Sequence, residues 1–381
     1  MPDQPAATFT PPKELKAFQN DRQLCVARFS PCGNFLAAGA MEGTVRRWKV
    51  VEKPKAAVDV ELPDEPKKKP AAKKAPEESP VDLVPLPHLT GFNGWVQNLA
   101  FHPKDKVIFA ADTWGKLAAL AYEGDGPKPI WENATAHDGW IRRLAISADG
   151  QHLATCGRDQ FVRIWTTAGK LVAEHRAEAE VFAVTFAPAG KLVAFGDLKG
   201  RVKTWDFGTK QVVRDFDASV LFSLSRLQDV CGLRVVTFID AGKSLLVGGC
   251  EPAGGGFLEG APVLVKFDTA TGKKQTEWKF GAAKDGFVLD LAAHPGGYLI
   301  VVTSGQPGSG KIMFLRPGEK EPFFTHTGVA NVHSVTLHPD GKRFAVSAMN
   351  KASNGNGRPK TADGSYPGNT SPVHLFEIPA A

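Results

Sequence analysis

The sequence has few cysteines and no long hydrophobic run. These two features argue against a disulfide-rich or zinc-binding protein and against a membrane protein. The five cysteines of this 381-residue chain form no Cys-x-x-Cys pair, so neither a zinc site nor a disulfide framework is indicated. Several of them lie in apolar segments, where a free thiol acts as a small hydrophobic side chain, and this favours a reducing, cytoplasmic compartment. Because no apolar stretch is long enough to span a bilayer and no signal peptide is evident, we expect no membrane partner.

Charge of one sign does not dominate the chain either. The formal net charge is +6, and lysines are concentrated in the segment PKKKPAAKKAP, residues 66–76, among acidic residues. No expected strand carries a stripe of Lys or Arg with interleaved aromatic residues. Nucleic acid is therefore not the expected partner.

Glycine and proline are abundant, with 39 and 28 residues, and they separate many short apolar runs. This pattern is typical of an all-β chain. Three segments align directly, residues 26–50, 144–167 and 184–207, each with two apolar strands, two turns and a third strand that ends in Trp. Four weaker copies begin at residues 99, 236, 291 and 335. The Trp position is filled in turn by Trp48, Leu120, Trp165, Trp205, Phe267, Leu315 and Phe376.

Seven copies at this spacing predict seven four-stranded blades, because the uninterrupted intervals match the length of one blade. The chain thus resembles the WD-repeat (WD40) β-propeller family. The third copy has that family's structural tetrad at the proper spacing, namely His137, Thr155, Asp159 and Trp165. The resemblance implies that these four residues fasten the strands together and do not catalyse a reaction. Most other copies lack the tetrad, and the degenerate repeats favour a bacterial source.

The domain boundaries follow from closure of the ring. The seventh copy has no fourth strand after residue 378, so we expect residues 14–21 to supply it, as in the family's usual closure. Residues 1–13 are then a flexible tail, and residues 14–381 form one propeller. Residues 51–80, rich in Lys, Pro and Ala, predict a disordered insertion in blade one. This insertion is either a solvated spacer or a docking segment for an acidic partner.

Longer loops are expected on the opposite, top face of the propeller. They are residues 219–230, 251–261, 304–311 and 350–371, which form a crescent over neighbouring blades. Binding residues often lie on loops held by a rigid scaffold, so this face is the expected binding surface. One loop, GQPGSGK at residues 305–311, resembles a phosphate-binding loop. A strand follows it where a helix is required, so we interpret it as a hairpin turn.

The residue before each innermost strand should face the mouth of the central channel. These positions are Gln23, Trp95, Trp140, Glu180, Gly232, Phe287 and Asn331. Trp and Arg are favoured at interface hot spots. The expected partner-binding residues are therefore Trp95, Trp140, Arg158 and Phe287, with Phe257 and Tyr366 on the loops. The alternative is that the aromatic residues only plug the channel.

These patterns predict a non-catalytic scaffold that binds another protein on its top face. The alternative is a propeller enzyme or small-molecule binder with a site at the channel mouth, for which Glu180, Asp112 and Glu251 would be the first residues to consider. His102, His294 and His338 occupy equivalent turns in separate blades, so they are not expected to converge on a metal. We expect no catalytic residue, no metal and no cofactor.

Overall fold

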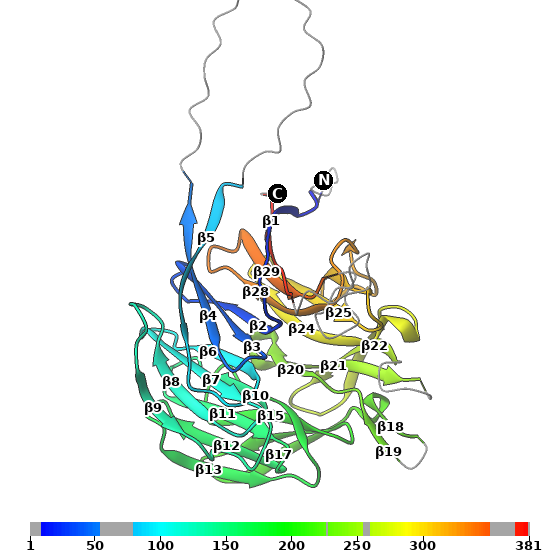
Figure 1. Ribbon diagram of the computed structural model, residues 1–381. Coiled ribbons are helices and arrows are strands. Elements are labelled where there is room, and N and C mark those ends of the chain that lie inside the picture. Colours follow the sequence, from blue (N-terminus) through cyan, green and yellow to red (C-terminus); the bar gives the residue numbers. More distant parts are fainter. Residues whose placement is uncertain (1–8, 54–78, 226–227, 254–259, 351–369, 380–381) are drawn as a thin grey trace, which may run out of the picture.

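The computed structural model describes residues 9–53, 79–225, 228–253, 260–350 and 370–379. Seven four-stranded antiparallel sheets surround a central channel (Figure 1), which confirms the expected seven-bladed β-propeller. Helical structure in the described ranges is limited to three short 3-10 turns, and none of them has the length and hydropathy needed to cross a membrane.

Blades one to four follow one another along the chain, each running from its innermost to its outermost strand. Blade one consists of β2 (Leu24–Phe29), β3 (Phe35–Ala40), β4 (Val45–Glu52) and β5 (Val81–Leu89). Blade two consists of β6 (Val96–Phe101), β7 (Val107–Asp112), β8 (Leu117–Ala121) and β9 (Pro129–Asn133). Blade three consists of β10 (Ile141–Ile146), β11 (His152–Gly157), β12 (Phe161–Thr166) and β13 (Leu171–Arg176). Blade four consists of β14 (Val181–Phe186), β15 (Leu192–Asp197), β16 (Arg201–Asp206) and β17 (Gln211–Asp217).

The remaining three blades complete the ring. Blade five consists of β20 (Val235–Ile239), β21 (Ser244–Pro252), β22 (Gly260–Asp268) and β23 (Lys274–Lys279). Blade six consists of β24 (Phe287–His294), β25 (Tyr298–Ser304), β26 (Lys311–Leu315) and β27 (Phe324–His326). Blade seven consists of β28 (Val332–Leu337), β29 (Arg343–Ala348), β30 (Val373–Glu377) and β1 (Lys13–Phe18). The antiparallel pairing of β25 with β26 confirms that residues 305–311 form a hairpin turn.

Sequence composition separates the inner strands from the outer ones. The second strand of a blade is buried on both faces, as in β7, and it reads as a continuous apolar run. The outermost strands are largely exposed, as in β17, and β5 carries two prolines. Proline is tolerated there because the far edge of an outermost strand pairs with no other strand. The hydrophobic core lies between adjacent blades, for example where Phe101 of blade two packs with Val26 of blade one.

The ring is closed by the N-terminal strand, as expected. β1 pairs antiparallel with β30, from Lys13 opposite Glu377 to Phe18 opposite Val373, and in Figure 1 the dark-blue β1 lies beside the red C-terminal strand. The observed strand is Lys13–Phe18, so the predicted range of residues 14–21 is three residues too long at its end. Beyond the last ladder pair, Asn20 contacts Ser371 twice. Its side-chain amide donates to the Ser371 carbonyl oxygen, and its own carbonyl oxygen accepts the Ser371 N–H.

Two insertions differ from their sequence-based boundaries. β4 continues through Val51 and Glu52, which pair with Asp82 and Val81, so the predicted start of the insertion at residue 51 is wrong. Residues 54–78 of that insertion lie outside the described residues. The segment expected as a loop at residues 219–230 contains a 3-10 turn, η1 (Ser219–Leu221), and a hairpin of β18 (Phe222–Ser225) with β19 (Gln228–Cys231).

Candidate binding site at the mouth of the central channel

A β-bulge interrupts the innermost strand of six blades near its start, at the second residue in five of them and at the third in blade six. In blade three, for example, the register shifts between Ile141 and Arg143. The same shift occurs in blades one, two, four, six and seven. A bulge leaves one residue unpaired and re-aims its side chain. The bulged residues are Cys25, Gln97, Arg142, Phe182, Leu289 and His333.

These side chains gather around one cavity. The six bulged residues, together with Arg234 of blade five, all line a hollow of about 430 Å³. We call these seven residues the mouth ring. A second hollow of about 310 Å³ lies further along the channel and shares Asn98 and Arg143 with the first. The first of these, lined by the mouth ring, is called the upper hollow, and its volume falls within the size range of ligand pockets.

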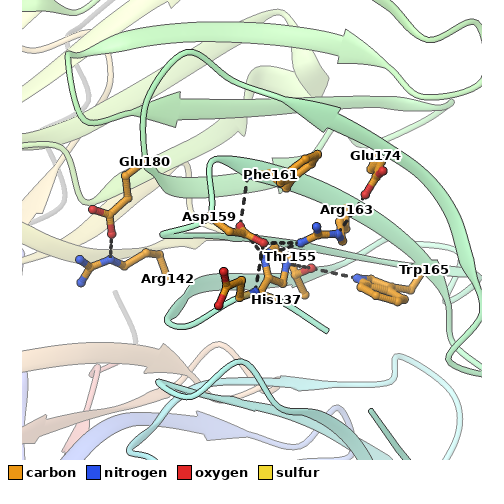
Figure 2. A network of polar contacts seen from close by, with 10 residues as sticks. His137, Arg142, Thr155, Asp159, Phe161, Arg163, Trp165, Glu174 and Glu180 are labelled. Carbon is orange, nitrogen blue, oxygen red and sulfur yellow. Dashed lines mark hydrogen bonds and ion pairs between the residues drawn. The ribbon is translucent and has the colours of Figure 1, made fainter. Parts of the chain in front are cut away.

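The mouth ring is basic and aromatic. The guanidinium of Arg142 lies 3.7 Å from the ring centre of Trp140 and 4.6 Å from that of Phe182. Its Nε donates to Glu180 at 2.6 Å, a pair shown in Figure 2. These contacts hold the guanidinium in one orientation, because stacking and ion pairing act on it together.

Phe287 is placed differently from the sequence-based expectation. Its ring is buried, and the Arg234 guanidinium covers it at 4.3 Å. It therefore supports Arg234 and does not present an aromatic anchor at the surface. Phe287 stands two residues before its bulge residue Leu289, as Trp140 does before Arg142, so its different exposure goes with the cover by Arg234 and not with the bulge.

An ion-pair triad crosses the channel where the two hollows meet. Asp290 of blade six lies 2.9 Å from Arg28 of blade one and 3.2 Å from Arg143 of blade three. The Asp290 side chain is 5% exposed, whereas the two arginine side chains are 24% and 27% exposed. Two positive charges therefore share one buried carboxylate at the floor of the mouth.

Two buried polar atoms at the mouth have no hydrogen-bond partner among the described residues. They are Oε1 of Gln23 and Nε2 of His333, and both residues line the upper hollow. Burial lowers the pKa of His333 to about 4, so its imidazole is neutral near pH 7. Buried polar groups are normally paired, so these two atoms are available to a ligand.

Trp95 and Trp140 form the rim of the mouth on neighbouring blades. Their rings meet edge to face at 6.3 Å, and Trp95 is 43% exposed. Trp140 is held by its indole N–H, which donates to Gln97. Arg158 is exposed in the next turn, where its backbone N–H donates to the carbonyl oxygen of Trp140. The structure thus brings these three predicted residues together on one part of the top face.

Sequence reasoning missed several residues of this surface. Trp114 is 68% exposed in the turn beside Gly94, next to Trp95. Arg142, Phe182 and Arg234 were missed because the repeat alignment singles out the residue before each innermost strand. The signal that would have revealed them is a break in the apolar alternation near the start of an innermost strand. Phe257 and Tyr366 lie outside the described residues.

The residues suggested for an enzyme do not converge. Asp112 accepts backbone N–H groups of its own turn, Glu180 pairs with Arg142, and Glu251 pairs with Lys279. Each of the three carboxylates thus has a structural partner, and the three carboxylates belong to different blades. Among the described residues, no group of His, Cys, Asp or Glu has the arrangement of a metal site.

The predicted tetrad forms a continuous chain in blade three (Figure 2). His137 Nδ1 lies 2.9 Å from Asp159, and His137 Nε2 lies 2.7 Å from the Thr155 hydroxyl. The Trp165 indole N–H donates to the same hydroxyl at 2.9 Å. Burial lowers the pKa of His137. Although burial of Asp159 acts in the opposite sense, hydrogen bonds from His137 and Arg163 hold the pKa of this carboxyl well below its usual range.

Comparison with known proteins agrees with this architecture. Residues 10–49 and 130–166 match the family model described as WD domain, G-beta repeat. Each match starts near the outermost strand of one blade and ends in the third strand of the next, so the sequence repeat straddles two blades. This offset explains why β1 belongs to blade seven. The chain is a seven-bladed β-propeller in which two segments match the WD40 repeat.

Curated WD40 relatives are similar over part of the chain. The chain is 28% identical over 188 residues to the WD repeat-containing protein 55 homolog of Drosophila ananassae, covering 46% of this chain and 37% of that protein. It is 26% identical over 151 residues to WD repeat-containing protein 55 of Danio rerio, covering 38% and 36%. It is 29% identical over 90 residues to WD repeat and SOCS box-containing protein 1 of Takifugu rubripes, covering 24% and 21%. The similarity spans well under half of each relative's length.

Proposed function

We propose that this WD40 propeller is a non-catalytic interaction platform that binds a peptide or loop of another protein across its top face. The observation that carries the proposal is the continuous surface formed by Trp95, Trp140 and Arg142 at the channel mouth. Trp and Arg are enriched at interface hot spots, where a rigid ring and a stacked guanidinium lose little entropy on binding.

Two further observations support the proposal. WD-repeat proteins are generally scaffolds for protein interactions, and the relatives are named as WD repeat-containing proteins. The carboxylates considered for catalysis are held in separate structural contacts. The buried free thiol of Cys156 supports a reducing, cytoplasmic location, which fractionation of host cells would test.

The test is affinity capture from the native host with three forms of the full chain. Wild type is compared with the double variant Trp95→Ala/Trp140→Ala and with Ile130→Ala/Val213→Ala. Ile130 and Val213 are 57% and 52% exposed on the outer strands β9 and β17, so the control removes exposed apolar area away from the mouth.

A protein captured by wild type and the outer-strand control, but lost from the Trp variant, is the expected result. Its binding should be reproduced with the purified partner. Equal capture by all three forms would overturn the assignment of the top face. In that case the lysine-rich segment at residues 66–76 would be neutralised next, because the alternative electrostatic docking site is there.

A further inference from the structure

We propose that the mouth ring receives the carboxylate of an Asp or Glu side chain from the bound polypeptide. This inference rests on the proposed function and adds the chemistry of the partner. It follows from the charge of the mouth, its unpartnered polar atoms and its shape.

The charge of the mouth favours an anion. The upper hollow is lined by Arg142, Arg143 and Arg234, and none of its described lining residues is Asp or Glu. Arg142 is already paired with Glu180, which does not itself line the hollow. At the floor, Arg28 and Arg143 share the single carboxylate of Asp290, which leaves one positive charge in excess within this triad. An excess charge in a partly buried site interacts more strongly with a counter-charge than it would in bulk water.

The hydrogen-bonding groups also suit a peptide with an acidic side chain. The neutral imidazole of His333 has no partner at Nε2, which can carry the ring proton and donate it to a carboxylate oxygen. The buried Oε1 of Gln23 has no partner either, and it can accept a hydrogen bond from a peptide N–H. A single acidic residue would therefore satisfy both the excess charge and these two atoms.

The arrangement of the guanidinium groups favours a carboxylate. Arg142 of blade three and Arg234 of blade five both stack on Phe182 of the blade between them, at 4.6 and 5.5 Å. Stacking fixes the plane of a guanidinium, and a fixed planar fork binds a planar carboxylate through two parallel hydrogen bonds.

The experiment selects binding peptides from a phage library of random dodecapeptides on the full-length protein. The best peptide is then synthesised with a fluorescent label, together with versions in which each Asp or Glu is replaced by Asn or Gln. Affinities are measured by fluorescence polarisation on wild type, Arg143→Gln and Arg234→Gln. Arg316→Gln is the matched control, since Arg316 also stacks on a ring, Phe323 at 4.0 Å, and pairs with Glu319, outside the mouth ring.

We expect one acidic position whose conversion to the amide weakens binding to wild type about tenfold, in line with the loss of a charge-assisted hydrogen bond. The same conversion should weaken binding to Arg143→Gln or Arg234→Gln about twofold or less. Arg316→Gln should behave as wild type. Using two arginine variants guards against one that fails to fold, which thermal melting would reveal.

The outcomes separate this inference from the proposed function. Peptides that require Trp95 and Trp140 but contain no essential acidic residue would overturn the proposal that the mouth ring binds a carboxylate. They would leave the proposed interaction platform in place. The carboxylate proposal is also overturned if only peptides with phosphoserine at this position bind. It is overturned too if replacing the acid by its amide costs the same affinity in both arginine variants as in wild type. No enriched peptide, or enrichment insensitive to Trp95→Ala/Trp140→Ala, would count against the platform itself.

Discussion

The imidazole Nε2 of His338 lies 3.1 Å from the carbonyl oxygen of Gly33, and this contact joins the last blade to the first. The other ring nitrogen, Nδ1, accepts the backbone N–H of Asp340 in its own turn. His338 therefore links two turns with one ring. It also packs edge to face against Phe29 at 5.0 Å.

The same link recurs at two other blade boundaries. His102 Nε2 lies 2.9 Å from the Gly150 carbonyl oxygen, and His294 Nε2 lies 2.7 Å from that of Gly341. In each case Nδ1 accepts a backbone N–H two or three residues further on. The three His-Pro sequences are thus blade-to-blade fasteners, which agrees with their predicted places in separate turns.

The close approach of His338 to Gly33 provides a first prediction, in which alanine substitutions at Gly33 and at Gly190 are compared. Gly33 and Gly190 occupy equivalent turns with φ of +76° and +79°, yet an added Cβ would meet His338 Nε2 at 2.4 Å only at Gly33. Gly190→Ala should cost about 1 kcal/mol in unfolding free energy from backbone strain alone. Gly33→Ala should cost about 3 kcal/mol, because the His338 link is also lost. Chemical denaturation measures both values.

The double variant Gly33→Ala/His338→Ala identifies the cause. In the absence of the His338 imidazole, Gly33→Ala should lower the unfolding free energy only as much as Gly190→Ala does. The difference between its two effects is then a large coupling energy between Gly33 and His338. Equal costs for Gly33→Ala and Gly190→Ala in the wild-type background would show that the link contributes nothing to stability.

The fold was predictable from sequence because repetition survives when individual motifs are lost. Trp48, Trp165 and Trp205 mark the same strand position in three blades, and the remaining copies keep a large apolar residue there. The closing strand was also predictable, since a ring with a missing strand leaves an open edge. The end of this strand was harder to predict, because the sequence pattern does not reveal the bonds that Asn20 makes to Ser371 beyond the last ladder pair.

The candidate site was only partly predictable, because the bulges change which side chains reach the channel mouth. A register shift of one residue changes which side chain faces the channel. Trp95 and Trp140 lie at the rim, whereas Phe287, at the equivalent position of its blade, is buried under Arg234. Arg142 and Arg234 emerge at the mouth because of local backbone geometry, which apolar periodicity does not reveal.

The tetrad of blade three provides a second prediction. Thr155→Val removes the hydroxyl that joins His137 to Trp165, and leaves the buried indole N–H without a partner. We expect a loss of about 2–3 kcal/mol in unfolding free energy. Thr303→Val is the control, because Thr303 is 1% exposed and its hydroxyl has no partner among the described residues.

The control should be neutral or slightly stabilising, since it replaces an unsatisfied buried hydroxyl by a methyl group. Urea denaturation of the two variants beside wild type measures the difference. Similar losses of unfolding free energy in both variants would mean that any buried Thr-to-Val change disturbs these strands. The hydrogen-bonded chain of the tetrad would then make no particular contribution to stability.

Closure by β1 provides a third prediction. Leu15 and Phe18 of this strand pack against the core cluster between blades seven and one. Deleting residues 1–18 removes this packing and exposes the edge of β30, whereas deleting residues 1–12 keeps the strand intact. We expect the longer deletion to lose about 4 kcal/mol or more and to aggregate. Thermal melting with light scattering compares the two forms, and equal melting would contradict closure as a source of stability.

His333 makes stability depend on pH in a defined direction. Its pKa is lowered to about 4 in the folded protein by burial, whereas the unfolded chain has the ordinary value near 6.5. Between these two values the unfolded state binds a proton that the folded state does not, so stability falls as pH decreases from about 6.5 to 4. The contribution is about 3 kcal/mol at pH 4, at 1.36 kcal/mol per pKa unit.

The measurement is the unfolding free energy of wild type and His333→Gln at several pH values from 7 to 4, without any peptide ligand. Burial also lowers the pKa of His88, His137 and His175, but these residues are common to both proteins and cancel in the difference. The variant should therefore lose less stability than wild type on acidification, and the gap between their losses should grow steadily below pH 6.5. Parallel curves would show that the His333 ring takes up its proton in the folded state as readily as in the unfolded chain. The mouth would then gain a positive charge on mild acidification, and a carboxylate-bearing peptide would bind more tightly at pH 5.5 than at pH 7.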